Sequence, residues 1–121
     1  MKAFSFASRE AANRPSCVIY DLTGYIDAHT VIEFEKAIYS AVETGVSCII
    51  LDISGLSYIS SAGIGAMMRL ARKLAQKGGD LVLLNPSPKV FAILDGLGFT
   101  RIFKIAADEA AAVELLESGA N

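Results

Sequence analysis

Tryptophan is absent from the 121 residues, histidine occurs once and cysteine twice. So few imidazole and thiol groups leave little material for a metal site of the usual His/Cys kind. The net charge is -2, so basic residues are not in excess. This argues against nucleic-acid binding. No uncharged apolar run reaches the ~18 residues of a membrane helix, and the N-terminal segment lacks the apolar middle of a signal peptide. We therefore expect a cytoplasmic protein that binds neither membrane nor nucleic acid.

The sequence also lacks the motifs of common enzymes. It contains no G-x-S-x-G nucleophile motif, and its single histidine, His29, has no evident catalytic partner. The segment GIG at 63–65 matches only part of a dinucleotide-binding motif. Cys17 and Cys48 begin apolar segments without metal-ligand spacing, so we interpret them as small buried thiols. We expect no catalysis, no cofactor and no metal.

What the sequence does contain is a regular alternation of strand-like and helix-like segments. Four times a short apolar run precedes a segment of helical periodicity: CVIYDLTG before TVIEFEKAIYSAVE, SCIILDI before AGIGAMMRLARKLAQ, DLVLLN before PKVFAIL, and RIFKI before DEAAAVELL. This order is typical of βαβ units with parallel strands. The segment AFSFA at 3–7 adds a candidate antiparallel edge strand. We predict one α/β domain over residues 1–121, with a four- to five-stranded mostly parallel sheet and about four helices.

Capping residues mark the expected helix ends. They are Thr30 and Gly45 for the first helix, Gly78 and Gly79 after the second, Ser87 with Pro88 for the third, and Asp108 with Glu109 for the last.

On the first helix, Ile32 and Tyr39 fall outside the apolar stripe. The sequence leaves open whether they cover an end of the sheet or meet a partner.

The second helix, expected over 62–77, has three kinds of surface when projected at 3.6 residues per turn. The predicted core stripe is Ile64, Met67, Met68, Ala71, Leu74 and Ala75, and the opposite face is Arg69, Arg72, Lys73 and Gln76. Gly63, Ala66 and Leu70 lie on a flank between these two surfaces. This flank has the small, mildly apolar character of a docking groove, although a boundary position explains it equally well.

Polar residues follow three of the predicted strands. The first loop contains Asp27, His29 and Thr30, the second Ser57, Ser60 and Ser61, and the third Asn85 and Ser87. The carboxyl ends of parallel strands meet at one edge of a sheet, where ligands and partners commonly bind. We therefore expect the three loops to be neighbours.

Ser60 and Ser61 stand at the predicted start of the second helix. A serine there accepts a hydrogen bond from an exposed backbone N–H and caps the helix, which needs no further role. The same free amides and the helix dipole also favour a phosphate group at this position. Phosphorylation would add about -1.5 to -2 charges and oppose a partner that docks on an uncharged surface.

At these residues the sequence resembles the STAS domain family, and within it the stand-alone bacterial anti-sigma factor antagonists. LTGYIDAHT is similar to the family's L-x-G-x-L-D-x-x-T segment, and LDISGLSYISSAGIGAMMRL to its strand, loop and phosphoacceptor helix. GGDLVLLNPSPKVFAILDGLGFTRIFKI is similar to the remaining strand, third helix and closing strand. The resemblance covers nearly the whole chain and implies the STAS fold.

The resemblance also implies a partner-switching mechanism. The domain would bind an anti-sigma factor that is a serine kinase of the histidine-kinase-like ATPase type, be released by phosphorylation, and be reset by a serine phosphatase. The phosphoacceptor falls on Ser61, with Ser60 as the rival, and Asp27 falls on the loop aspartate beside it. The expected partner-binding residues are Asp27, His29, Thr30, Ser57, Ser60, Ser61, Ala62, Gly63, Ala66, Leu70 and Asn85.

Two positions depart from the family pattern. Where many antagonists have D-S-S-G, this chain has Ser60, Ser61, Ala62 and Gly63, and Tyr25 stands where an acidic residue often precedes the loop aspartate.

Two other hypotheses about the function remain open. One is an unphosphorylated STAS subunit of a larger assembly, such as a stressosome-like or lipid-transport complex, and the other is a small-molecule or nucleotide sensor.

Overall fold

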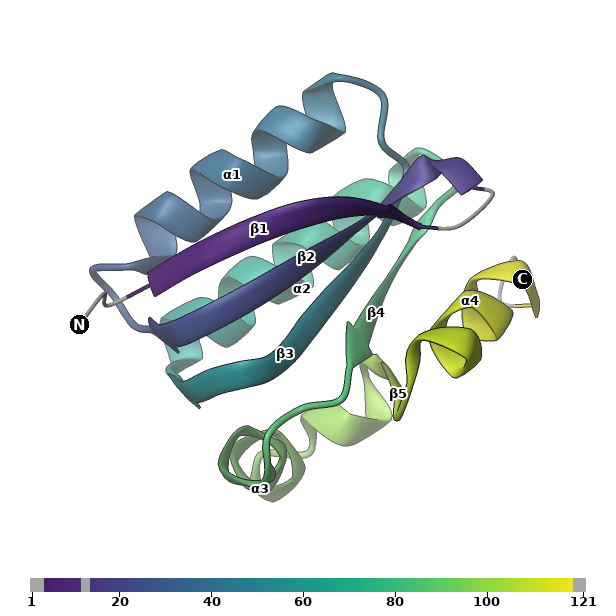
Figure 1. Ribbon diagram of the computed structural model, residues 1–121. Coiled ribbons are helices and arrows are strands. Elements are labelled where there is room, and N and C mark those ends of the chain that lie inside the picture. The colour runs from purple at the N-terminus through teal and green to yellow at the C-terminus, as the bar shows by residue number, and fades with distance from the viewer. Residues whose placement is uncertain (1–3, 12–13, 119–121) are drawn as a thin grey trace.

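The computed structural model describes residues 4–11 and 14–118, which form a five-stranded sheet with helices on both faces (Figure 1). The strands lie side by side in the order β1 (Phe4–Ala11), β2 (Arg14–Ile26), β3 (Cys48–Ile59), β4 (Asp80–Leu84) and β5 (Lys104–Ala106). Only β1 is antiparallel to its neighbour. The helices are α1 (Val31–Glu43), α2 (Ser61–Gln76), α3 (Pro88–Gly96), the short η1 (Phe99–Arg101) and α4 (Glu109–Ser118). The predicted α/β fold with an antiparallel edge strand is confirmed.

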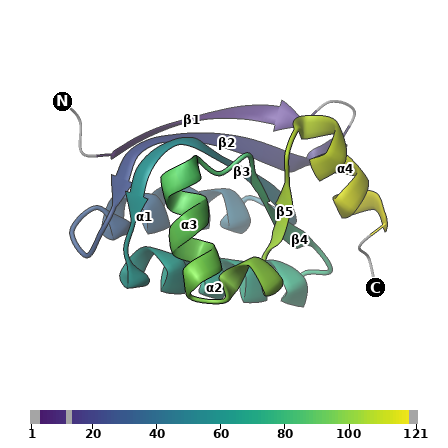
Figure 2. The same ribbon diagram turned by 90° about the horizontal axis from the view of Figure 1, so that it is seen from below.

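Two cores lie on opposite faces of the sheet. Helices α1 and α2 pack side by side on one face, whereas α4 covers the other face over β4 and β5 (Figure 2). The larger core, under α1 and α2, includes Phe34, Ile38, Ile64, Met67 and Leu83, and the smaller core, under α4, includes Ile19, Ile50, Val82, Ala112 and Leu116. The central strands contribute to both cores, which explains their near-continuous apolar sequences.

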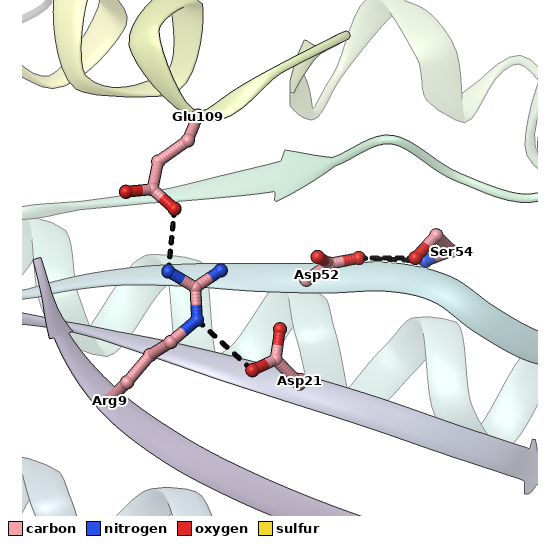
Figure 3. A network of polar contacts seen from close by, with 5 residues as sticks. All are labelled: Arg9, Asp21, Asp52, Ser54 and Glu109. Carbon is pink, nitrogen blue, oxygen red and sulfur yellow. Dashed lines mark hydrogen bonds and ion pairs between the residues drawn. The ribbon is translucent and has the colours of Figure 1, made fainter.

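A polar network lies on the face of the sheet that carries α4 (Figure 3). Nε of Arg9 donates to Oδ2 of Asp21 at 3.1 Å, and its Nη1 donates to Oε1 of Glu109 at 2.6 Å. Asp52, the register partner of Asp21 on β3, accepts hydrogen bonds from the amide and the hydroxyl of Ser54. Arg9 thus connects the first turn of α4 to strands β1 and β2.

Strands β2 and β3 extend well beyond their predicted apolar runs. Their register shifts between Asp21 and Thr23 and again between Gly24 and Tyr25. A Cβ atom on Gly55 would lie 2.8 Å from the carbonyl oxygen of Leu22 and 2.9 Å from Cγ2 of Thr23, so only glycine fits this close approach. The sequence predicted a loop around Ser57. The structure has strand there instead, and β3 continues to Ile59.

The predicted orientation of α2 is wrong for four residues. Gly63, Ala66 and Leu70 are buried against the sheet, whereas Ala75 of the predicted stripe is exposed. A Cβ atom on Gly63 would lie 2.7 Å from Cγ2 of Ile26 and 2.8 Å from Cγ1 of Ile59. The helix rolls toward its small residues because they let it approach the extended ends of β2 and β3. This flank, for which the sequence left a docking groove and a boundary position open, is therefore part of the core.

Most predicted helix ends are confirmed. Gly45 ends α1 with a φ of +103°, and Gly78, with a φ of +78°, follows α2. Ser87 caps α3 by accepting from the amide of Val90, with Pro88 at the first helical position. Asp108 accepts from the amide of Ala111 at the start of α4. No helix within the described ranges is long and apolar enough to cross a membrane.

The outer surface of α1 carries two residues whose location the sequence left open. Ile32 is 56% exposed, and Tyr39 is half-buried. Nζ of Lys73 on α2 lies 5.6 Å from the centre of the Tyr39 ring. Ile32 therefore faces solvent, whereas Tyr39 helps to join α1 to α2.

Candidate functional site

The candidate site lies at the carboxyl ends of β2 and β3. Ile26 and Ile59, the last residues of the two strands, are register partners. The amide of Ser60 donates to the carbonyl oxygen of Ile26 at 2.9 Å, which joins the loop before α1 to the start of α2. The first and second predicted loops are therefore neighbours.

Asp27 organises the loop before α1. Its Oδ1 accepts hydrogen bonds of 2.9 Å from the amides of His29 and Thr30. The amide of Thr30, more than that of His29, lowers the pKa of the Asp27 carboxyl below its usual value because both stabilise the charged form. The loop next to the serine pair therefore carries a fixed negative charge.

Thr30 has a different role from the predicted helix cap. Its Oγ1 donates to the carbonyl oxygen of Tyr25 and accepts from the amide of Asp27, both at 2.9 Å. The side chain does not cap α1, and the residue is 6% exposed. The first amide of α1, from Val31, is instead bonded to the carbonyl oxygen of Asp27 at 2.9 Å. Thr30 is a buried bridge across the loop because its hydroxyl satisfies two backbone groups there.

The two serines have distinct environments. Ser60 is extended, with φ -92° and ψ 172°, and its Oγ accepts from the amide of Gly63 at 3.3 Å. Ser61 is the first residue of α2 and is exposed. Among residues 4–11 and 14–118, the hydroxyl of Ser61 has no hydrogen-bond partner. Ser60 therefore caps the helix, and Ser61 presents its hydroxyl to solvent.

Other polar groups lie on the loop before α1, on the end of β3 and on α3. His29 is exposed, and Ser57 lies on β3 with its Oγ donating to the carbonyl oxygen of Gly24 at 3.0 Å. Tyr58 is 41% exposed, and Nζ of Lys89 on α3 lies 5.9 Å from the centre of its ring. Sequence reasoning missed Tyr58 and Lys89, because the outward direction of Tyr58 depends on the strand extension.

The third predicted loop meets the second at Ser87 but not at Asn85. β4 ends at Leu84, opposite Asp52, whereas β3 runs on to Ile59 before reaching the serines. Asn85 follows β4 directly, with a φ of +48°, and its amide donates to the carbonyl oxygen of Ala106. Asn85 is therefore placed at the β4–β5 end of the sheet, away from Ser61. The expectation that the three loops are neighbours therefore fails for Asn85, because β3 and β4 are parallel strands that end at different levels.

Ser87 connects α3 to the extended part of β3. Its Oγ donates to the carbonyl oxygen of Leu56 at 2.7 Å while it also caps α3. Helix α3 thus occupies the space beside β3 where a longer β4 would have continued (Figure 1).

The two cysteines face each other on neighbouring strands. Cys17 and Cys48 are register partners on β2 and β3 and are unpaired thiols. Cys17 is fully buried and Cys48 half-buried, and burial raises the pKa of the Cys48 thiol. Within the described part of the chain, no group of three His, Cys, Asp or Glu side chains is placed to hold a metal ion.

Comparisons with known proteins agree on one family. The family model that matches residues 8–112 is the STAS domain. An anti-sigma F factor antagonist of Lysinibacillus sphaericus is 39% identical over 85 residues, covering 67% of this chain and 72% of that protein. Another, from Paenibacillus polymyxa, is 27% identical over 110 residues, covering 89% and 93%.

Solved structures are similar over the same span. The anti-sigma factor antagonist SpoIIAA in its unphosphorylated form is 28% identical, with a TM-score of 0.74 over 92% of this chain and 96% of that one. The Bacillus cell fate determinant SpoIIAA in the phosphorylated form is 27% identical, with a TM-score of 0.68 over 92% and 99%.

Proposed function

Because the chain belongs to the STAS domain family, we propose that it is an anti-sigma factor antagonist switched off by phosphorylation of Ser61. In this proposal the unphosphorylated chain binds an anti-sigma factor that is also a serine kinase of the histidine-kinase-like ATPase type. Phosphorylation releases the chain, and a serine phosphatase restores it. The chain is then the substrate of other enzymes and has no catalysis of its own.

One observation carries the choice of residue, namely the contrast between the two serines. A kinase needs a hydroxyl that can enter its active site without unfolding the substrate. Ser60 is held as a helix cap, whereas Ser61 is exposed and has no hydrogen-bond partner within the described residues. The first turn of α2 contains no acidic residue that would oppose a new phosphate.

The relatives support the same mechanism. Proteins 39% and 27% identical to this chain are named as anti-sigma F factor antagonists, which are regulators rather than enzymes. SpoIIAA, at 28% and 27% identity, has been solved in unphosphorylated and phosphorylated forms. A protein of this fold therefore carries the modification without losing its structure.

The proposed partner surface follows from the exposure of the predicted residues. His29, Ser57 and Ser61 are exposed, and Asp27, Ser60 and Ala62 are half-buried beside them. Gly63, Ala66 and Leu70, which we expected on this surface, are buried, and Thr30 holds its loop. The proposed surface does not include Asn85, which follows the shorter strand β4.

The switch has a simple electrostatic basis. A phosphate adds about -1.5 to -2 charges at neutral pH beside a loop that already carries the negative charge of Asp27. A partner complementary to the uncharged serine supplies no counter-charge of its own and would have to desolvate the phosphate. A penalty of about 3 kcal/mol would weaken binding about a hundredfold.

Labelling of single variants tests the proposal. The chain is incubated with ATP and the anti-sigma serine kinase captured from its own organism, and intact mass is measured. We expect one phosphoryl group on the wild type and on Ser60→Ala, and none on Ser61→Ala. Circular dichroism of each variant verifies that the fold is retained. Undiminished phosphorylation of the Ser61→Ala protein would refute the assignment of Ser61.

A further inference from the structure

Arg69 lies on the same side of α2 as Ser61. Ser61, Gly65 and Arg69 follow one another at intervals of four residues, which places them in a row along the helix surface. A Cβ atom on Gly65 would lie 3.5 Å from Nη1 of Arg69. The guanidinium therefore reaches back over Gly65 toward the start of the helix, the direction in which helical side chains tilt.

This placement brings the guanidinium within one helical turn of Ser61. Side chains four residues apart on a helix have Cβ atoms about 5–6 Å apart. The backbone of Arg69 is about 12 Å along the axis from Ser61, and its side chain covers roughly half of that separation. Gly65 has no side chain to stand between the two groups, and a longer residue there would occupy the position of Nη1.

The two terminal nitrogens of Arg69 have different surroundings. Nη2 donates to Oε2 of Glu35 on α1 at 2.9 Å, and the guanidinium also interacts with the side chain of Tyr39. Nη1 lies beside Gly65, 3.5 Å from the position that a Cβ atom there would take. The side chain of Arg69 is 55% exposed and that of Glu35 is 27% exposed. A planar guanidinium carries five donors and can serve two oxyanions at once, which an ammonium group does less well. The bond to Glu35 thus holds the group in place without using its whole donor set.

We propose that Arg69 is the counter-ion that receives the phosphate on Ser61, with Glu35 and Gly65 positioning its guanidinium for this role. The inference rests on the proposed phosphorylation of Ser61. A phosphate dianion is a stronger acceptor than a carboxylate and forms charge-assisted hydrogen bonds with arginine. The phosphate would be held against α2, and its doubly charged form would be favoured. Arg69 would accordingly contact the phosphate in the modified state only, and Glu35 and Gly65 are the positioning residues.

The test measures the second pKa of phosphoserine placed at position 61 by genetic-code expansion, so no kinase is involved. Phosphorus NMR is recorded against pH for three phosphorylated chains: wild type, Arg69→Gln and Arg72→Gln. A nearby cation favours the dianion, so its loss raises this pKa from its value in the wild type. We expect a rise of about 0.5 pH unit in Arg69→Gln, the size typical of an exposed ion pair.

Arg72 provides the matched control. It has the same charge on the same helix and faces nearly the same direction as Ser61, but lies about 16 Å along the axis, beyond the reach of screened interactions. A rise of less than 0.2 pH unit is expected in Arg72→Gln, roughly the low end for an exposed pair. Equal shifts in the two variants, or none in Arg69→Gln, would overturn the proposal.

Two further comparisons keep the outcome interpretable. Should circular dichroism find Arg69→Gln unfolded, the neutral variants Arg69→Met and Arg72→Met replace the pair, and the pKa must rise only in the former. Failure of a kinase to label Ser61 counts against the proposed function and leaves the NMR result intact. If the kinase phosphorylates Ser61 but Arg69→Gln leaves the second pKa of the phosphoserine unchanged, the role of Arg69 is refuted and the proposed function stands.

Discussion

Ser60 and Ser61 show how adjacent residues of one type take separate roles. The hydroxyl of Ser60 is bonded to the amide of Gly63, whereas that of Ser61 is exposed. The sequence predicted that the serines begin a helix, because their position between an apolar strand and a periodic segment is a local signal. Which serine caps depends on the residue at which the backbone turns from extended to helical, and the structure places that turn at Ser60.

Removal of each hydroxyl should therefore affect stability differently. Ser60→Ala leaves the amide of Gly63 without its acceptor, and we expect the free energy of unfolding to fall by about 1 kcal/mol. Ser61→Ala removes an exposed group and should change it by less than about 0.5 kcal/mol. Urea denaturation followed by circular dichroism measures both. A larger loss in Ser61→Ala than in Ser60→Ala would contradict the assignment of the cap.

Asp27 makes a second prediction at this scale, concerning pH. Hydrogen bonds from Thr30 and His29 lower its pKa in the folded state below the unfolded value near 3.8. A lowered carboxyl pKa gives stability that is present above the unfolded value and is lost as pH falls through the folded value. Asp27→Asn should therefore show a weaker fall in stability between neutral pH and acid than the wild type. Identical pH profiles of the two proteins would show that the loop does not stabilise the carboxylate.

At the scale of elements, the long ends of β2 and β3 decide the geometry of the site. The alternation of apolar and helical segments was enough to predict the parallel sheet and its helices, because each apolar run is short and each helix has its own end signals. The strand extensions were not predictable, because they depend on register shifts and on a close approach at Gly55. The roll of α2 follows from these extensions, so it was mispredicted with them.

Two glycines of α2 test this account of the packing. Gly63→Ala would place a methyl group 2.7 Å from Ile26 and 2.8 Å from Ile59, and overpacking of this kind typically costs about 1–3 kcal/mol. Gly65→Ala meets only the end of Arg69 at 3.5 Å, and the better helix propensity of alanine should add about 0.5–1 kcal/mol. Thermal or urea unfolding of the two variants should therefore move in opposite directions. A neutral Gly63→Ala would mean that α2 is free to shift away from the sheet.

At the scale of the whole molecule, unequal strand lengths separate Asn85 from the serine pair, although the sequence predicted that they lie together. Asp27, Ser60 and Ser61 lie together at the far ends of β2 and β3, whereas Asn85 lies at the end of the shorter β4. Sequence reasoning placed them together because the carboxyl ends of parallel strands share an edge. That rule predicts the edge of the sheet at which the loops lie, but the lengths of the strands decide how far apart the loops are.

A pair of charge substitutions distinguishes these two surfaces in the function proposed. Ser61→Asp adds a negative charge at the centre of the proposed partner surface and should weaken binding to the anti-sigma kinase at least about tenfold, since burying an unpaired charge costs more than 1.4 kcal/mol. Asn85→Asp adds the same charge at an exposed position whose positive φ of 48° aspartate tolerates. We expect its affinity to stay within about twofold of wild type, because charges separated by more than a Debye length are largely screened. Isothermal titration calorimetry against the same kinase measures both affinities, and comparable losses in the two variants would show that the interface extends across the sheet edge to β4.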